Sequence, residues 1–150
     1  MRAPQPSELV ALDLGQSDGF RACQCGPCAK LFDTGGDWSE KLWLLHRKLA
    51  ERVLASHPGK TVNMTSYILT ANPPKSFHQF PANVQIMLTG TNEEDLAPWR
   101  GHVVPQGFTG YIYNWCPNLS TRYTPMRTPG FVETQARRLV ANRMQSIYQD

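Results

Sequence analysis

TVNMTSYIL, residues 61–69, is the stretch of sequence that decides the fold. Its side chains alternate, with Val62 and Met64 on one side, and it is rich in β-branched and aromatic residues, which predicts a β-strand. A second strand is predicted at residues 83–90 (NVQIMLTG), where glycine again closes the run. The segment between them, which begins with the breaker NPP at residues 72–74, is too short and proline-rich for a good helix. The central residues 61–90 are therefore predicted to form two successive strands without a helix between them.

A long amphipathic helix is predicted directly before this centre, over residues 37–58. Asp37 can accept hydrogen bonds from the amides of the first turn, and Glu40, three residues later, can reach back. Pro58-Gly59 ends the helix. The apolar side chains of one face, repeating at three and four residues, are Leu42, Leu45, Leu49 and Val53. The polar side chains expected on the other side are Lys41, Arg47, Lys48, Glu51 and Arg52.

Strands and helices also alternate in the outer parts of the sequence. Apolar runs at residues 8–15 (ELVALDLG) and 107–115 (GFTGYIYNW) predict a first and a fourth strand. Acidic residues at 92–95 predict a short helix, because negative charge is favoured in a first helical turn. A last helix is expected from Thr128-Pro129 to the end of the sequence, with no strand after it. Its expected apolar side consists of Val132, Ala136, Leu139, Val140 and Ile147.

This order predicts an α/β fold with mainly parallel strands joined by right-handed crossovers. We expect residues 1–150 to form a single domain that is a partial (β/α)-barrel, about half of a TIM-type barrel. An open four-stranded sheet is the structural alternative. A last helix that leads into no strand would indicate that the chain belongs to a larger protein.

The composition limits the possible partners. With 41% apolar and 18% charged residues, the chain is globular. Its net charge of +3 is spread along the chain without a basic block, so we expect no nucleic-acid partner. No apolar run approaches the roughly 20 residues that span a bilayer, so we expect no membrane partner. The first residues also lack the apolar core of a secretory signal.

Polar and aromatic side chains follow the predicted strands, at the ends where parallel α/β folds collect their functional groups. They suit a saccharide, because aromatic rings cover the apolar face of a sugar while carboxylates and amides bind its hydroxyls. Glycoside cleavage usually uses two carboxyl groups. The acids proposed for this role are Asp18 and Glu94. The residues proposed to bind substrate are Tyr67, Asn72, Tyr113, Asn114 and Trp115.

Each of these residues has a plainer interpretation. Asp18 could simply bond its own backbone in the turn before Gly19. Glu94 could be one of the acids that favour a helix start. Tyr113 or Trp115 could point into the core. The saccharide hypothesis therefore depends more on the joint placement of these residues at strand ends than on any one of them.

The cluster Cys23-Gln24-Cys25-Gly26-Pro27-Cys28 has three interpretations. It could be a loop stiffened by a disulfide or by packing, and then no cofactor is expected. It could hold zinc, with a fourth ligand from Cys116, His46 or His102. It could be a redox pair of the C-G-P-C form. We disfavour the redox pair, because about a dozen residues separate the cluster from the predicted helix.

Several motifs follow one another along the chain: the Asp-Gly turn, the Cys-x-x-Cys pair, a helix ending in HPGK, NPPKSFHQFPANVQIML, GFTGYIYNW and RTPGFVETQARRLV. Together they resemble a bacterial family of uncharacterised, glycosidase-like (β/α)8-barrel domains of unknown function, similar to alpha-glucuronidases and hexosaminidases. The resemblance covers nearly the whole chain. It implies a catalytic-type barrel, usually within larger exported proteins, that acts on or binds glycans.

By position, the resemblance matches Asp18 to the family's Asp-Gly turn and Cys25 and Cys28 to its cysteine pair. Tyr113 and Trp115 match the aromatic end of a barrel strand. The opening strands of such a barrel are missing, so part of the active site would be missing too. The sequence thus predicts a glycoside hydrolase-like protein. The alternatives are a non-catalytic glycan-binding module or inactive fragment, and a small zinc or redox protein.

Overall fold

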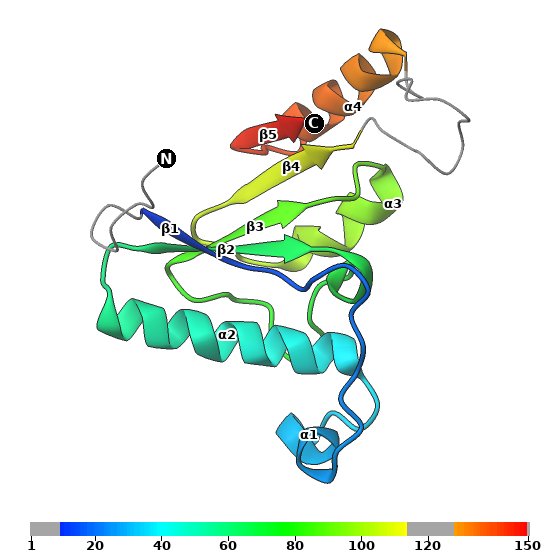
Figure 1. The fold of residues 1–150 in the computed structure, drawn as a ribbon. Coiled ribbons are helices and arrows are strands. Elements are labelled where there is room, and N and C mark those ends of the chain that lie inside the picture. Colours follow the sequence, from blue (N-terminus) through cyan, green and yellow to red (C-terminus); the bar gives the residue numbers. More distant parts are fainter. Residues whose placement is uncertain (1–9, 114–127, 150) are drawn as a thin grey trace, which may run out of the picture.

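The computed structural model describes residues 10–113 and 128–149, which form a mixed α/β fold around one five-stranded sheet (Figure 1). All neighbouring strands are parallel, and their order in the sheet follows their order in the chain. The strands are β1 (Ala11–Leu14), β2 (Thr61–Ser66), β3 (Val84–Leu88), β4 (Phe108–Ile112) and β5 (Ser146–Gln149). The predicted α/β class with parallel strands is confirmed, and the arrangement is consistent with part of an α/β barrel.

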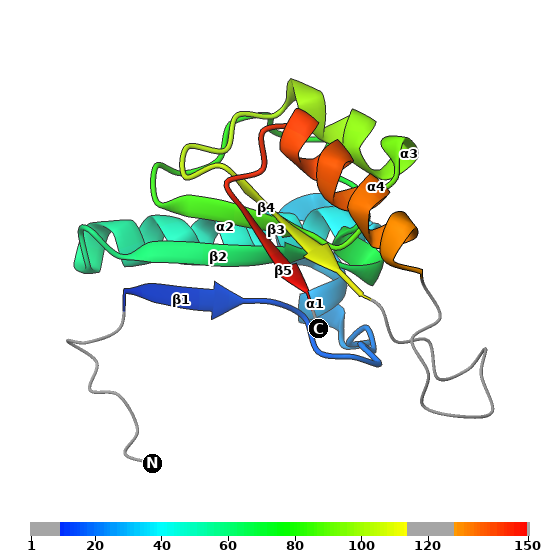
Figure 2. The same cartoon turned by 90° about the horizontal axis from the view of Figure 1, so that it is seen from above.

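The helices are α1 (Gly26–Lys30), α2 (Trp38–Ser56), α3 (Glu93–Leu96) and α4 (Pro129–Ala141), with 3-10 turns at Leu31–Asp33, Ile68–Thr70 and Ala97–Gly101. Helices α2, α3 and α4 pack on one face of this sheet, whereas α1 lies apart from the sheet on the segment before α2 (Figure 1). Trp43 of α2, Leu96 of α3 and Leu139 of α4 belong to one apolar core, which also contains Val62, Ile86 and Ile112 of the sheet. The short helix α3 and helix α4 lie side by side in both views (Figures 1 and 2).

The opposite face of the sheet is polar and partly exposed, because side chains alternate between the two faces of a strand. Asp13, Asn63 and Gln85 are aligned across β1, β2 and β3 on this face. The Asn63 amide donates a hydrogen bond of 2.9 Å to the Asp13 carboxylate. The sheet therefore has an apolar side against the helices and an open side that polar ligands could reach.

The prediction of a continuous last helix is wrong. Helix α4 ends at Ala141, because Arg143 adopts a left-handed backbone conformation with φ of 60°, which stops the helical hydrogen bonding. The amide of Met144 instead bonds the carbonyl of Leu139 at 3.1 Å. The chain then enters β5 beside β4, so the sheet has five strands and Ile147 lies on a strand.

The predicted face of the long helix is confirmed in part. Leu42 is buried and Val53 packs against the core, but Leu45 is 38% exposed. The core-facing stripe of α2 also contains Trp43, His46 and Ala50. The ring of Trp43 fills the core, and its indole nitrogen donates to the carbonyl of Asn72 at 2.8 Å. Lys41, expected on the solvent side, is buried because it binds backbone carbonyls of the cysteine loop.

No helix in the described part of the chain has both the length and the apolar character needed to cross a membrane.

Candidate functional site

A pocket of about 750 Å³ opens at the carboxyl ends of the strands. Four strands contribute to it, directly or through the loops that follow them, and α4 supplies Phe131 and Gln135. Its chemically active side chains are Asp18, Thr65, Tyr67, Thr89, Thr91, Asn92, Asp95, Tyr111, Tyr113 and Gln135. Parallel topology explains this gathering, since all strands end at the same edge of the sheet.

Asp18 and Tyr67 form a pair within the pocket. The Tyr67 side chain is hydrogen-bonded to the Asp18 carboxylate, which raises the pKa of the tyrosine above its ordinary value of 10. The negative charge of Asp18 adds to the effect, because a second negative charge would form beside it. Tyr67 is therefore held as a neutral donor, and Asp18 is fixed as an acceptor at the pocket edge.

The loop that carries Asp18 is tied to the turn after β2. The Gln16 side chain donates to the carbonyl of Tyr67. The buried hydroxyl of Thr70 lies 3.3 Å from the Gln16 side-chain oxygen and 3.0 Å from the carbonyl of Thr65. In this turn Ile68 has φ of 49°, a rare conformation for a β-branched residue. The hydrogen bonds of Gln16 and Thr70 hold the turn in place.

Three tyrosine rings form a nearly parallel row on the open face of β4 and β5. The ring centroids of Tyr111 and Tyr148 are 5.4 Å apart at an interplanar angle of 10°, and those of Tyr111 and Tyr113 are 6.2 Å apart at 20°. Tyr111 and Tyr113 line the pocket. Such rings present flat apolar surfaces edged by hydroxyl groups. Tyr148 was missed in the sequence because its strand was read as helix.

Asp95 supplies the second carboxylate of the pocket. One of its oxygens accepts a hydrogen bond of 3.1 Å from the amide of Asn92 and so caps α3. The side chain lies against Gly90, where an added Cβ would come within 2.5 Å of it. The close approach requires glycine at this position, which explains why the third predicted strand ends in that residue.

Helix α4 contributes a buried amide to the pocket wall. Gln135 is 3% exposed, and its side-chain nitrogen donates to the Thr91 hydroxyl. Its side-chain oxygen is buried and has no hydrogen-bond partner among the described residues. Arg138, one turn later, donates to the Thr91 carbonyl at 3.0 Å. An unpaired buried acceptor beside a pocket indicates a place where a ligand hydroxyl could bind.

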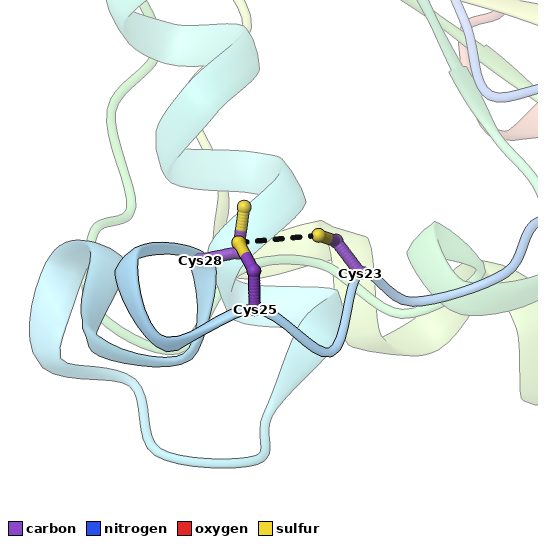
Figure 3. A group of neighbouring side chains, drawn as sticks. All are labelled: Cys23, Cys25 and Cys28. Carbon is purple, nitrogen blue, oxygen red and sulfur yellow. Dashed lines mark hydrogen bonds between the residues drawn. The ribbon is translucent and has the colours of Figure 1, made fainter.

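The cysteine cluster lies on the loop before α2, and its three thiols turn toward one another (Figure 3). The sulfur atoms all lie within 4.8 Å of one another, and those of Cys23 and Cys25 are 3.4 Å apart. Hydrogen bonds from the Cys28 backbone and from the neighbouring thiols lower the pKa of Cys25. The bonds that Cys28 makes to Cys25 and Cys23 raise its own pKa to about 11. The hydrogen bonds within the cluster thus favour the thiolate form of Cys25 and the protonated form of Cys28.

A short helix begins within the cysteine cluster, whereas the sequence predicts about a dozen residues between the cluster and the next helix. Helix α1 begins at Gly26, directly after Cys25, with Pro27 in its first turn. The helix was missed because it is only five residues long. His46 and His102 do not join the cysteines in the described part of the chain, where the group consists of the three thiols. Cys116 lies outside the described residues.

Residues 3–148 match a sequence family described as a domain of unknown function, DUF4838. The chain belongs to this family. No curated protein and no solved structure matches it. The DUF4838 assignment supports the expected relation to a domain of unknown function.

Three of the residues predicted for the DUF4838 site come together in the pocket: Asp18, Tyr67 and Tyr113. Glu94 lies on exposed α3 and does not line the pocket, where Asp95 takes that place. Asn72 also lies outside the pocket lining, and its carbonyl binds Trp43. Asn114 and Trp115 lie outside the described residues. The catalytic and binding roles assigned to all these residues stay predictions.

Proposed function

We propose that this DUF4838 chain is a carbohydrate-active protein, related to glycoside hydrolases, whose strand-end pocket binds a saccharide. The observation that carries the proposal is the convergence of Asp18, Tyr67 and the tyrosine row of β4 in one pocket of about 750 Å³. A pocket of this size can enclose a small organic molecule or a short oligosaccharide.

The pocket offers both kinds of contact that a sugar ring needs. The flat faces of Tyr111 and Tyr113 can cover its apolar C–H face. Asp18 and the unpaired oxygen of Gln135 can accept hydrogen bonds from its hydroxyl groups. The Tyr67 hydroxyl is hydrogen-bonded to Asp18, so a saccharide that binds Asp18 would also contact Tyr67.

Hydrolysis would require two carboxyl groups on opposite sides of the glycosidic bond. Among the pocket residues, Asp18 and Asp95 are the two carboxylates, and they come from different elements, the loop after β1 and α3. In this role one would protonate the leaving oxygen and the other would act as nucleophile or base. Glu94, which the sequence predicts as the second acid, precedes Asp95 in α3 but does not line the pocket.

A non-catalytic glycan-binding module is the second candidate, and the state of Asp95 favours it. One Asp95 oxygen already accepts from the amide of Asn92. A carboxylate that caps a helix is less free to exchange protons with a substrate. The tyrosine row and Gln135 would still bind a sugar without any turnover.

The test is to titrate the chain with oligosaccharides by calorimetry and to assay aryl glycosides, including glucuronides and N-acetylhexosaminides. We expect Tyr113→Ala to weaken saccharide binding by about 1–3 kcal/mol, a range typical for the loss of one aromatic contact. If hydrolysis occurs, Asp18→Asn and Asp95→Asn should each abolish it, whereas binding without hydrolysis would favour the second candidate.

Asp13→Asn is the matched control, because Asp13 lies on the same open face of the sheet but outside the pocket lining. It should leave binding and turnover unchanged. No saccharide binding by the wild-type chain, or equal losses in Asp13→Asn and Asp18→Asn, would contradict the proposal.

A further inference from the structure

We propose that Cys23, Cys25 and Cys28 form a zinc site that is separate from the strand-end pocket. The three residues do not line that pocket, and they lie on the loop between β1 and α2 (Figure 3). Nothing in the proposed saccharide chemistry uses them.

The positions of the sulfur atoms fit a single ion. In a tetrahedral site with Zn–S bonds of about 2.3 Å, two thiolate sulfurs are about 3.8 Å apart. The sulfurs of Cys23 and Cys25 are 3.4 Å apart, and the third lies within 4.8 Å of both. Small side-chain rotations would therefore place all three at bonding distance from one centre.

The backbone that carries the thiols is fixed to the body of the molecule. The ammonium group of Lys41 donates to the carbonyls of Cys28, Ala29 and Leu31 at 2.8, 3.1 and 2.9 Å. Lys41 is 2% exposed and comes from α2, so a buried lysine joins the end of α1 to the long helix. Because these hydrogen bonds already order the backbone, less conformational entropy is lost when the three thiols bind one ion.

Three thiolates select a soft or borderline ion, because sulfur ligands suit zinc whereas oxygen ligands suit magnesium and calcium. No fourth Cys, His, Asp or Glu joins the group within residues 10–113 and 128–149. The described residues therefore supply three ligands, and in the proposed site water takes the fourth position, as it does in zinc sites with three protein ligands. Each thiol releases its proton to solvent when its sulfur binds the ion.

The experiment titrates the reduced full chain with zinc chloride against a chromophoric chelator, and with cobalt chloride to observe the thiolate-to-metal absorption band. We expect one zinc per chain and a sulfur-to-cobalt band. Cys23→Ser, Cys25→Ser and Cys28→Ser should each weaken zinc binding by about tenfold or more, since even the loss of residues that only orient metal ligands costs about 10–100-fold.

Cys116→Ser is the matched control, because it removes the one cysteine outside the cluster. It should bind zinc as the wild type does, and a loss equal to that of Cys25→Ser would overturn water as the fourth ligand. Two further outcomes would overturn the site itself: no zinc binding by the reduced chain, or equal zinc affinity in the wild type and the Cys25→Ser variant. The thiol count of the chain before reduction would then show whether a disulfide occupies the cluster instead.

Discussion

The most informative single contact in the molecule is the one between Tyr67 and Asp18. It joins the loop after β1 to the end of β2, and it places a donor and an acceptor side by side at the pocket. Two further hydrogen bonds support the contact: the Gln16 side chain donates to the carbonyl of Tyr67, and the Thr70 hydroxyl donates to the Gln16 side chain. Its strength can be measured without knowing any ligand.

Asp18→Asn should lower the pKa of Tyr67 toward its ordinary value of 10. The carboxylate raises this pKa by accepting a hydrogen bond and through its negative charge, and the amide keeps neither effect in full. The measurement is the ultraviolet titration of phenolate in the wild type and in Asp18→Asn, with Tyr67→Phe identifying the signal. An unchanged titration of Tyr67 would show that the pair does not form in solution.

His46 should make stability fall in mild acid. Burial lowers the pKa of His46 below its unfolded value of 6.5, so the unfolded chain binds the proton more readily. The stabilising effect is therefore complete above pH 6.5 and decreases as the pH falls below that value. Urea unfolding of His46→Leu should show a flatter profile in this range, whereas the exposed His57→Leu should keep the wild-type slope.

The first turn of α2 carries two acidic side chains that bind the loop before β3. Asp37 caps the helix by accepting from the amide of Glu40 at 3.0 Å and forms an ion pair of 2.7 Å with Lys75. The carboxylate of Glu40 does not reach back to the start of the helix, as was expected, but accepts from the amides of Lys75 and Ser76. The two acids thus join the helix to the loop before β3.

Asp37→Ala should reduce the free energy of unfolding by about 1 kcal/mol, which is typical for the loss of a helix cap. The bond from Lys75 and the helix amide lower the pKa of Asp37 below 3.8, so its contribution is present above that pH and is lost as the pH falls further. Guanidinium unfolding at pH 7 and below pH 3.8 should show a difference between the wild type and Asp37→Ala that shrinks in acid. A difference that grows in acid would contradict this.

Lys41→Met should loosen α1 from α2. The substitution removes the one charged donor that three backbone carbonyls share, and hydrogen bonds to a charged group contribute about 1.5–3 kcal/mol. Hydrogen exchange should become faster at residues 25–33, and zinc affinity should fall although all three thiols remain. Arg52→Met, on the exposed part of the same helix, is the control and should change neither measurement.

For the molecule as a whole, the distance between the sheet and α4 depends on a residue without a side chain. An added Cβ on Gly110 of β4 would lie 2.6 Å from the buried side chain of Leu139. Close contact at this point also brings Gln135 and Arg138, on the same helix, to the loop that carries Thr91.

Gly110→Ala should therefore destabilise the fold by about 1–3 kcal/mol, as overpacking usually does, and should push Gln135 away from the pocket. Thermal unfolding measures the first effect, and saccharide titration measures the second. Gly130→Ala, at a position where an added Cβ meets nothing within 4 Å, should have little effect on either. Equal melting temperatures for wild type and Gly110→Ala would refute the argument.

The sequence predicted most of the architecture, because alternating strand and helix patterns are local. It missed β5 because four residues separate it from α4 and no glycine or proline marks the boundary. Parallel strands bring their carboxyl ends together, and for this reason the predicted residues Asp18, Tyr67 and Tyr113 line one pocket, although their roles stay predictions. Asp95, Tyr111 and Gln135 were missed, because the face of a strand or helix on which a side chain lies depends on long-range packing.

The sequential order of the strands has a consequence for how the chain is made. Each strand pairs with the one before it, so every partner has already been synthesised when the next strand leaves the ribosome. Successive units can add to a growing edge in the order of translation. A chain of this topology can therefore assemble during its own synthesis, and nascent fragments ending just after β3 or β4 should already protect the amides of β2 from exchange.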